Sequence, residues 1–217
     1  MENVKAPKFF DRHPGLKDSL SMLSFIAVVI VGTVLLNTLV FRSYNVVGAS
    51  MENTLHTGDR IIVNRLAVTI SHFQGKPYVP ERGQIIIFAN GGNDDHLRCD
   101  PKPGVKDQYV IKRVIAFPGE RVQVADGILT VWTDPDDDST AFNPDYYTRK
   151  SDTNGPKAQT DGAVDVIVPA GELFVSGDNR EGEHSYDSRN GLGTVPLCRI
   201  VGPAALRLFP LDQLRTF

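Results

Sequence analysis

Two residues of this chain could together carry out nucleophilic chemistry. Ser50 follows Gly48 and Ala49, two small residues that would let the backbone of a substrate approach closely. A serine hydroxyl is a poor nucleophile until a neighbouring base removes its proton. Taken alone, a serine after Gly-Ala is more often a turn residue, so nucleophilic chemistry would require a base elsewhere in the chain.

Lys112 is the candidate base. It interrupts the apolar run YVIKRVIA at residues 109–116, which has the composition of a β-strand. Because side chains alternate along a strand, Lys112 shares a face with Val110 and Val114, whereas Arg113 points to the other face. Burial among apolar neighbours would lower the pKa of the lysine, and the neutral amine could then accept a proton. A lysine that protects an edge strand from aggregation is the alternative explanation.

A polar segment at residues 176–189 could support such a pair. It begins with Ser-Gly-Asp-Asn-Arg, which is typical of a turn, and continues to Ser185, Asp187 and Arg189. The Ser185 hydroxyl could hydrogen-bond the lysine amine and orient it. Asp187 and Arg189 could form a fixed ion pair behind the site. By itself, however, the segment is also explained as a polar loop.

An uncharged run at residues 20–41 predicts a membrane-spanning helix. At about 1.5 Å per residue, it would extend roughly 33 Å, enough for a hydrocarbon core of about 30 Å. A cleaved signal peptide is the alternative, although its apolar core is usually shorter. Basic residues are concentrated before the run, at Lys5, Lys8, Arg12 and Lys17, whereas Arg42 alone follows closely. This asymmetry predicts a cytoplasmic segment at residues 1–19 and an extracytoplasmic domain at residues 42–217.

The composition of residues 42–217 limits what this domain can be. The length suits one domain, or a core with an insertion. Setting aside the first 41 residues leaves 19 Lys and Arg against 23 Asp and Glu, a balance that excludes a nucleic-acid binder. Cys99 and Cys198 lack the spacing of a zinc site. They could pair in an oxidising compartment, but their separation in sequence leaves the question open.

Short apolar runs bounded by Gly, Pro and Asp predict a mostly-β domain. The runs rich in Val and Ile are residues 44–47, 60–64, 84–89, 109–116, 121–125, 128–132, 164–168, 173–176 and 200–208. Asp126-Gly127 predicts a hairpin turn, and residues 64–73 give the best helix signal after the anchor. Residues 90–107 and 133–162 are predicted loops. The acidic cluster at residues 134–138 lacks EF-hand spacing, which favours a solvated loop over a calcium site.

Taken together, these segments resemble the type I signal peptidases, a family of Ser/Lys-dyad enzymes that remove signal peptides from exported proteins. The resemblance rests on the anchor and on four motifs that occur in the family's order. These are SMENTL (50–55), GDRIIVNR (58–65), YVIKRVIAFPGE (109–120) and SGDNR…SYDSR (176–189). It implies a single membrane helix followed by a β-rich catalytic domain, in which residues 124–170 form a variable inserted subdomain.

The resemblance also implies a role for each motif residue. Ser50 would be the nucleophile and Lys112 its general base, and Ser185 would position the lysine. Asp187 and Arg189 would be the supporting pair, while Gly58-Asp59 and residues 177–180 would be scaffold motifs. The Ser50 backbone N–H would stabilise the oxyanion.

The chain departs from the family in three places. Gly48 lacks the hydroxyl that some relatives add to the oxyanion hole. Asn53 stands where the family usually has proline, which predicts a less rigid turn after Ser50. Four residues separate Arg180 from Ser185, where the family commonly has two.

The sequence therefore predicts a membrane-bound serine endopeptidase that functions as a monomer without metal or cofactor. Its partners would be preprotein signal peptides and the lipid bilayer of the plasma membrane. The substrate would have small residues at positions −1 and −3. Apolar or small side chains near the dyad would line its pockets, namely Tyr44, Val46, Val47, Gly48, Met51, Leu55, Val110 and Ile111. A peptide paired with an exposed strand edge would be held extended.

Three other interpretations are compatible with parts of the sequence. A dedicated processing protease of one secretion, pilus or conjugation system would share the same chemistry, and genome neighbourhood would distinguish it. An inactive, anchored binding module would require Ser50 or Lys112 to be non-functional. A self-cleaving repressor also uses Ser/Lys chemistry, but the anchor and the missing DNA-binding helix pair argue against it.

Overall fold

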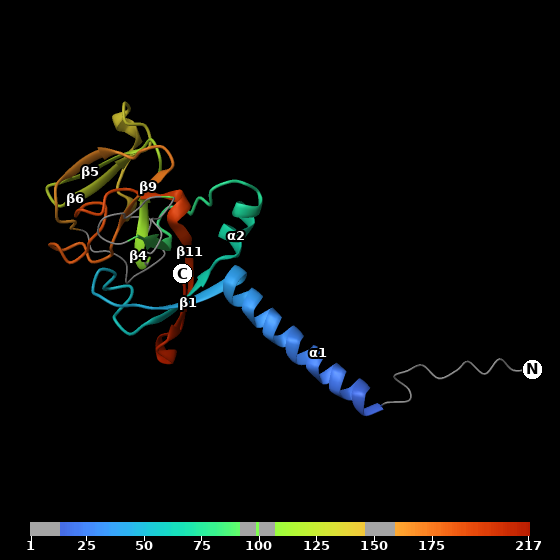
Figure 1. The fold of residues 1–217 in the computed structure, drawn as a ribbon. Coiled ribbons are helices and arrows are strands. Elements are labelled where there is room, and N and C mark those ends of the chain that lie inside the picture. The colour runs from blue at the N-terminus through green and yellow to red at the C-terminus, as the bar shows by residue number, and fades with distance from the viewer. Residues whose placement is uncertain (1–13, 92–98, 100–106, 146–158) are drawn as a thin grey trace, which may run out of the picture. The chain divides into compact units, whose positions relative to one another are not determined.

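The computed structural model describes residues 14–91, 99, 107–145 and 159–217. The chain divides into two compact units, Met1–Val40 and Phe41–Phe217. Each unit is described by itself (Figure 1).

The first unit is a long apolar helix. Helix α1 (Pro14–Leu35) continues into one turn of π-helix, η2 (Leu36–Val40). Within it, Asp18–Val40 contains an 18-residue window with a mean hydropathy of 2.4 and is the one span in the described residues that is long and apolar enough to cross a membrane. Thr33 and Thr38 donate hydrogen bonds to carbonyls four residues earlier, which satisfies these hydroxyls within the helix. The helix ends one residue before the predicted limit, because Phe41 already belongs to a strand.

The second unit is built on two antiparallel sheets, which confirms the predicted mostly-β fold. The first sheet has the order β1-β2-β11-β3-β4-β9-β10, with β12 paired to β11. Its strands are β1 (Phe41–Asn45), β2 (Arg60–Asn64), β3 (Ile85–Asn90), β4 (Gln108–Ala116), β9 (Glu172–Ser176), β10 (Val195–Pro196), β11 (Ile200–Phe209) and β12 (Arg215–Thr216). Helix α2 (Leu66–Phe73) follows β2, as predicted.

The second sheet has the order β7-β6-β5-β8. It consists of β5 (Arg121–Ala125), β6 (Ile128–Trp132), β7 (Ala141–Phe142) and β8 (Val164–Ile167). The β5–β6 hairpin turns at Asp126 and Gly127, which have φ of 52° and 77°. Positive φ at both central residues is typical of a type I′ turn, so the predicted hairpin is confirmed. Most of this sheet falls within residues 124–170, the predicted insertion.

The strand sequences follow their burial. The apolar run of β3 is buried along its whole length because the strand lies between β11 and β4 in the middle of the first sheet. In β5 and β6, by contrast, only alternate residues are buried, as expected of a sheet with one face on a core. That core joins the two sheets, since Ile115 and Phe174 of the first sheet pack with Val122 and Leu129 of the second.

Part of the predicted loop at residues 133–162 is ordered as short elements. A 3₁₀ turn, η3 (Asp138–Thr140), precedes strand β7. The Asp137 carboxylate accepts a hydrogen bond from the Ser139 backbone N–H at 2.9 Å and so caps this turn. Residues 146–158 lie outside the described part of the chain.

The two cysteines form a disulfide, which resolves the question left open by the sequence. The Cα atoms of Cys99 and Cys198 are 5.7 Å apart. Strands β4 and β11 flank β3 on opposite sides, with Phe88 of β3 opposite Val110 of one and Ile200 of the other. The first residues of these two strands therefore lie at the same end of the sheet, the end near which Cys198 precedes β11. Residues 92–98 and 100–106 lie outside the described part of the chain.

Candidate active site

Ser50 and Lys112 lie in contact, although 62 residues separate them. Lys112 Nζ is 2.6 Å from Ser50 Oγ. Lys112 lies on the central strand β4 and is only 3% exposed. Burial is the main cause that lowers the pKa of Lys112 from 10.5 to about 8, against the opposing effects of the Asp187 and Asp178 charges. The amine is therefore much more readily neutral near physiological pH than an exposed lysine.

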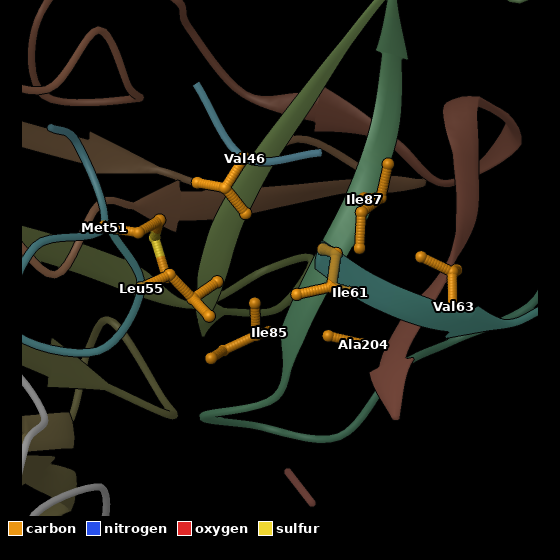
Figure 2. Packing of buried hydrophobic residues seen from close by; sticks show 8 residues of the cluster. All are labelled: Val46, Met51, Leu55, Ile61, Val63, Ile85, Ile87 and Ala204. Atoms are coloured by element: carbon orange, nitrogen blue, oxygen red, sulfur yellow. The ribbon is translucent and has the colours of Figure 1, made fainter. Parts of the chain in front are cut away.

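The turn that contains Ser50 is held by backbone hydrogen bonds and by two side chains buried in the core. Leu55 N–H donates to the Met51 carbonyl at 2.8 Å, and Glu52 N–H donates to the Ala49 carbonyl at 3.0 Å. The Met51 and Leu55 side chains are at most 1% exposed and pack with Ile61 and Ile85 (Figure 2). These two side chains hold the turn rather than line a pocket, although the sequence placed them among the substrate-binding residues.

A second turn holds Ser50 from the other side. The Asn179 backbone N–H donates to the Ser50 carbonyl, and its side-chain amide donates to the Ala49 carbonyl, both at 3.1 Å. Gly177 lies so close that a Cβ on it would overlap with the Ser50 carbonyl oxygen and with Ser185 Oγ. This residue must therefore be glycine for the two turns to meet. Sequence reasoning identified residues 177–180 only as a scaffold motif.

The turn after Ser50 is built on a left-handed residue. Asn53 has φ of 77°, and the following residue Thr54 donates from its backbone N–H to the Met51 carbonyl at 3.0 Å. Asparagine tolerates this conformation, whereas proline is restricted to φ near −65°. The backbone of this chain is thus incompatible with the proline that the resemblance implies. Gly48 is also left-handed, with φ of 100°, so a side chain there would be strained.

The predicted supporting pair is present beneath the site. Arg189 donates to both carboxylate oxygens of Asp187, at 3.1 and 2.9 Å, and both side chains are fully buried. Asp187 also accepts the Gly177 backbone N–H at 2.8 Å. Burial raises the pKa of Asp187 most, but its hydrogen bonds, those from Arg189 above all, outweigh burial and hold the pKa below the ordinary value. Asp187 is therefore a fixed negative charge.

Ser185 lies beside the dyad but is not bonded to Lys112 in the described structure. It is fully buried and adjoins Gly177, which itself contacts Ser50. Its hydroxyl contributes to lowering the Asp187 pKa, yet it meets full hydrogen-bond geometry with none of the described residues. The longer spacing after Arg180 thus still brings Ser185 to the site.

Sequence reasoning missed a second buried ion pair, Arg113–Asp178. Arg113 Nε donates to Asp178 Oδ1 at 2.7 Å, and Thr54 Oγ1 donates to Asp178 Oδ2 at 2.5 Å. The pair therefore connects β4 to both turns around Ser50. The sequence did contain a signal for this pair. Arg113 lies inside an otherwise apolar strand, and a buried arginine needs a partner of opposite charge.

A cavity of about 280 Å³ opens beside the dyad. It is lined by Ser50, by Ile87 of β3, by residues 44–47 and by residues 109–112. Five predicted substrate-binding residues line it, namely Tyr44, Val46, Val47, Val110 and Ile111, whereas Gly48, Met51 and Leu55 do not. Asn45, Ile87 and Tyr109 were missed. Tyr109 shares a strand face with Ile111, so the alternation along β4 could have identified it, whereas only the folded chain brings Ile87 of β3 to the cavity.

Two free strand edges border this cavity. Strand β1 is at the edge of the first sheet, and β4 pairs with β9 only from Arg113 onward. Residues 109–112 therefore have an unpaired backbone on the side away from β3. A serine hydroxyl against a buried lysine, beside two unpaired edges, is an arrangement that can hold an extended peptide and attack one of its carbonyl carbons.

Comparison with known proteins agrees with this chemistry. The family described as signal peptidase, peptidase S26, matches residues 19–209. The signal peptidase I of Bacillus licheniformis is 30% identical over 193 residues, covering 88% of each chain. Signal peptidase I T of Bacillus subtilis is 34% identical, covering 88% of this chain and 85% of the relative.

A solved signal peptidase I from Enterococcus faecalis is 25% identical with a TM-score of 0.37, and covers 58% of this chain and 96% of that one. A score this low does not bear on the fold. The family match alone covers most of the chain, and the chain therefore belongs to the signal peptidase family, peptidase S26. It is a serine endopeptidase of the signal peptidase I type, which cleaves signal peptides from preproteins.

Proposed function

We propose that Ser50 is the nucleophile of this peptidase and Lys112 its general base. The observation that carries the proposal is the 2.6 Å contact between Lys112 Nζ and Ser50 Oγ at a lysine whose pKa is lowered to about 8. Ser50 Oγ attacks the carbonyl carbon before the scissile bond, and its proton passes to Lys112 Nζ. Lys112 then returns that proton to the leaving amine as the C–N bond breaks. Water hydrolyses the resulting ester, with Lys112 again accepting the proton.

The oxyanion of each tetrahedral intermediate would be stabilised by the Ser50 backbone N–H. Within the described residues, this N–H has no hydrogen-bond partner, so it is available to an incoming oxygen. Gly48 supplies no hydroxyl, and its left-handed backbone makes a side chain there unfavourable. One fewer donor is consistent with a less complete oxyanion hole, since a single donor is often worth 10²–10³ in rate.

The buried groups behind the dyad would hold Lys112 in place. The Asp187–Arg189 pair fixes the backbone of Gly177, which in turn packs against the Ser50 carbonyl and Ser185. Ser185 has a buried hydroxyl that meets full hydrogen-bond geometry with none of the described residues, so it is available to a nearby donor such as the Lys112 amine. We assign Ser185 the role of positioning the lysine, and Asp187 and Arg189 the role of a rigid support.

The substrate would bind as an extended strand between β1 and residues 109–112. Its backbone would pair with the free edges, and its −1 and −3 side chains would enter the cavity lined by Val46, Val47 and Ile111. The small volume of this cavity favours small side chains at these positions.

The peptidase would act at the outer surface of the plasma membrane. Lys5, Lys8, Arg12 and Lys17 precede the apolar helix, which favours a cytoplasmic N-terminus and an extracytoplasmic domain. One anchored copy contains both residues of the dyad, so we propose that the monomer is the active form. Protease added to the outer face should digest the domain at residues 42–217; its complete protection would contradict this orientation.

The dyad is tested by cleavage of a preprotein in detergent, with N-terminal sequencing of the product. Ser50→Ala and Lys112→Ala should each abolish cleavage. Lys112→Arg should be equally inactive, because arginine stays protonated at any working pH. Ser139→Ala and Lys76→Ala, which change exposed residues of the same types, are the controls and should remain active. Substantial turnover by any of the three dyad variants would overturn the assignment.

A further inference from the structure

A cluster of one arginine and two tyrosines adjoins the cavity that Ser50 and Lys112 line. The Arg42 guanidinium carbon lies 5.4 Å from the centre of the Tyr44 ring and 5.1 Å from that of the Tyr109 ring. The two ring centres are 5.0 Å apart. We call these three residues the aromatic clamp. Both tyrosines line the cavity, so the clamp holds a positive charge beside its rim.

The clamp fixes the position of this charge. Arg42 and Tyr44 are two residues apart on β1 and therefore share a face of the strand. Contact with two aromatic rings holds the guanidinium by cation–π attraction, which restricts an otherwise flexible side chain. Arg42 is exposed, and among the described side chains it forms no ion pair with an acidic residue. Its charge is therefore open to a ligand.

The distance between the aromatic clamp and Lys112 indicates which side chain of a bound peptide would lie beside the clamp. Tyr109 precedes Lys112 by three residues on the same strand, a separation of about 10 Å. In an extended peptide the −5 side chain lies about 13 Å from the −1 side chain and on the same face. The −1 and −3 side chains occupy the cavity in the proposed binding mode. The −5 side chain would then leave the cavity beside Arg42.

We propose that Arg42 is a specificity-determining residue that favours an acidic over a basic side chain at position −5 of the substrate. This inference rests on the binding mode given under the proposed function. The effect is limited because the guanidinium is exposed and solvent screens it. A ratio of roughly three to ten in kcat/KM between Asp and Lys at this position is expected at low salt. The ratio should approach one in about 1 M salt, where the Debye length is only about 3 Å.

The test uses the full-length chain in uncharged detergent and three peptides with Ala at −1 and −3. The peptides differ only in having Asp, Asn or Lys at −5. The Asp-to-Lys ratio of kcat/KM is measured for the parent and for Arg42→Gln, which should lose the preference, and for Arg42→Lys, which should keep it. Arg121→Gln is the matched control, because Arg121 also stacks on an aromatic ring, Trp132, but lies on the second sheet.

Each outcome decides the proposal. Because the readout is a ratio within one variant, partial loss of folded protein does not affect it. A ratio unchanged by Arg42→Gln, or lost equally in Arg121→Gln, overturns the role of Arg42. Loss of all cleavage by Arg42→Lys would assign the clamp to structure and would also overturn it. If Ser50→Ala still cleaved these peptides, the dyad rather than the clamp would be refuted.

Discussion

Each of the two sheets carries an Arg–Asp ion pair, and the pair is buried at the first sheet but exposed at the second. Arg113 binds Asp178 through two hydrogen bonds beside the dyad, where the side chains are 5% and 0% exposed. Arg121 binds Asp165 through two hydrogen bonds on the second sheet, where the side chains are 32% and 46% exposed. The donor and acceptor atoms are the same in both pairs. Only their access to water differs.

This difference shows how the two regions are stabilised. Around Ser50 and Lys112, irregular turns are held by buried charged side chains, among them Asp178, Asp187 and Arg180. The Arg180 guanidinium, for example, donates to the Asp145 carboxylate at 2.7 Å. The second sheet has an apolar core and displays its charges on the surface. Buried pairs impose a single geometry because a charge that loses its partner there is very unfavourable. The surface pair imposes much less.

Removing one member of each ion pair should reveal this contrast most strongly. Asp178→Ala removes the carboxylate that neutralises the buried Arg113 charge and should reduce the free energy of unfolding by about 3–5 kcal/mol. Asp165→Ala should change it by about 0–1 kcal/mol, because water screens and replaces the exposed pair. Denaturant unfolding of the full chain in detergent measures both. Equal losses in the two variants would show that burial does not distinguish these pairs.

Adding one methyl group in each region should give the next largest effect. Gly177→Ala forces a Cβ against the Ser50 carbonyl and should lower kcat/KM by about 100-fold, since displacements near 1 Å can have that effect. In Gly127→Ala the new Cβ meets only the flexible Gln159 side chain, and the left-handed turn is strained. That variant should lose some stability while keeping its kcat/KM. Retention of full activity in Gly177→Ala would mean that the two turns can separate without consequence.

A change of one pH unit should have a smaller effect on kcat/KM than Gly177→Ala. The proposed mechanism requires a neutral Lys112, and burial lowers the pKa of this lysine to about 8. Below pH 8 the fraction of neutral lysine, and with it kcat/KM, should fall about tenfold per pH unit, whereas above pH 8 it should level off. The hydrogen bonds between Arg121 and Asp165 hold the Asp165 pKa below and the Arg121 pKa above their ordinary values, so this exposed pair stays ionised throughout this range. A rate that still rises in proportion to hydroxide up to pH 10 would contradict a lowered lysine pKa.

Much of the fold could be predicted because it depends on local patterns. Alternating or continuous apolar runs identified the main strands to within a few residues, and Asp126-Gly127 identified the hairpin. The pairing of Cys99 with Cys198 could not be decided in the same way, because it depends on β3 lying between β4 and β11. Strand order brings together residues that are far apart in the chain, and no local signal records it.

The site shows the same division at the level of single residues. Residue types and order were enough to predict the candidate site: a serine after two small residues, a lysine in an apolar strand, and the Asp187–Arg189 pair. Tyr44 of β1 contacts Tyr109 of β4 although three strands lie between β1 and β4 in the order of the first sheet, and both strands line the cavity. The tertiary structure also assigned Met51 and Leu55 to the core. Residue chemistry is local, whereas burial, and the lysine pKa that follows from it, arise only when distant segments exclude water together.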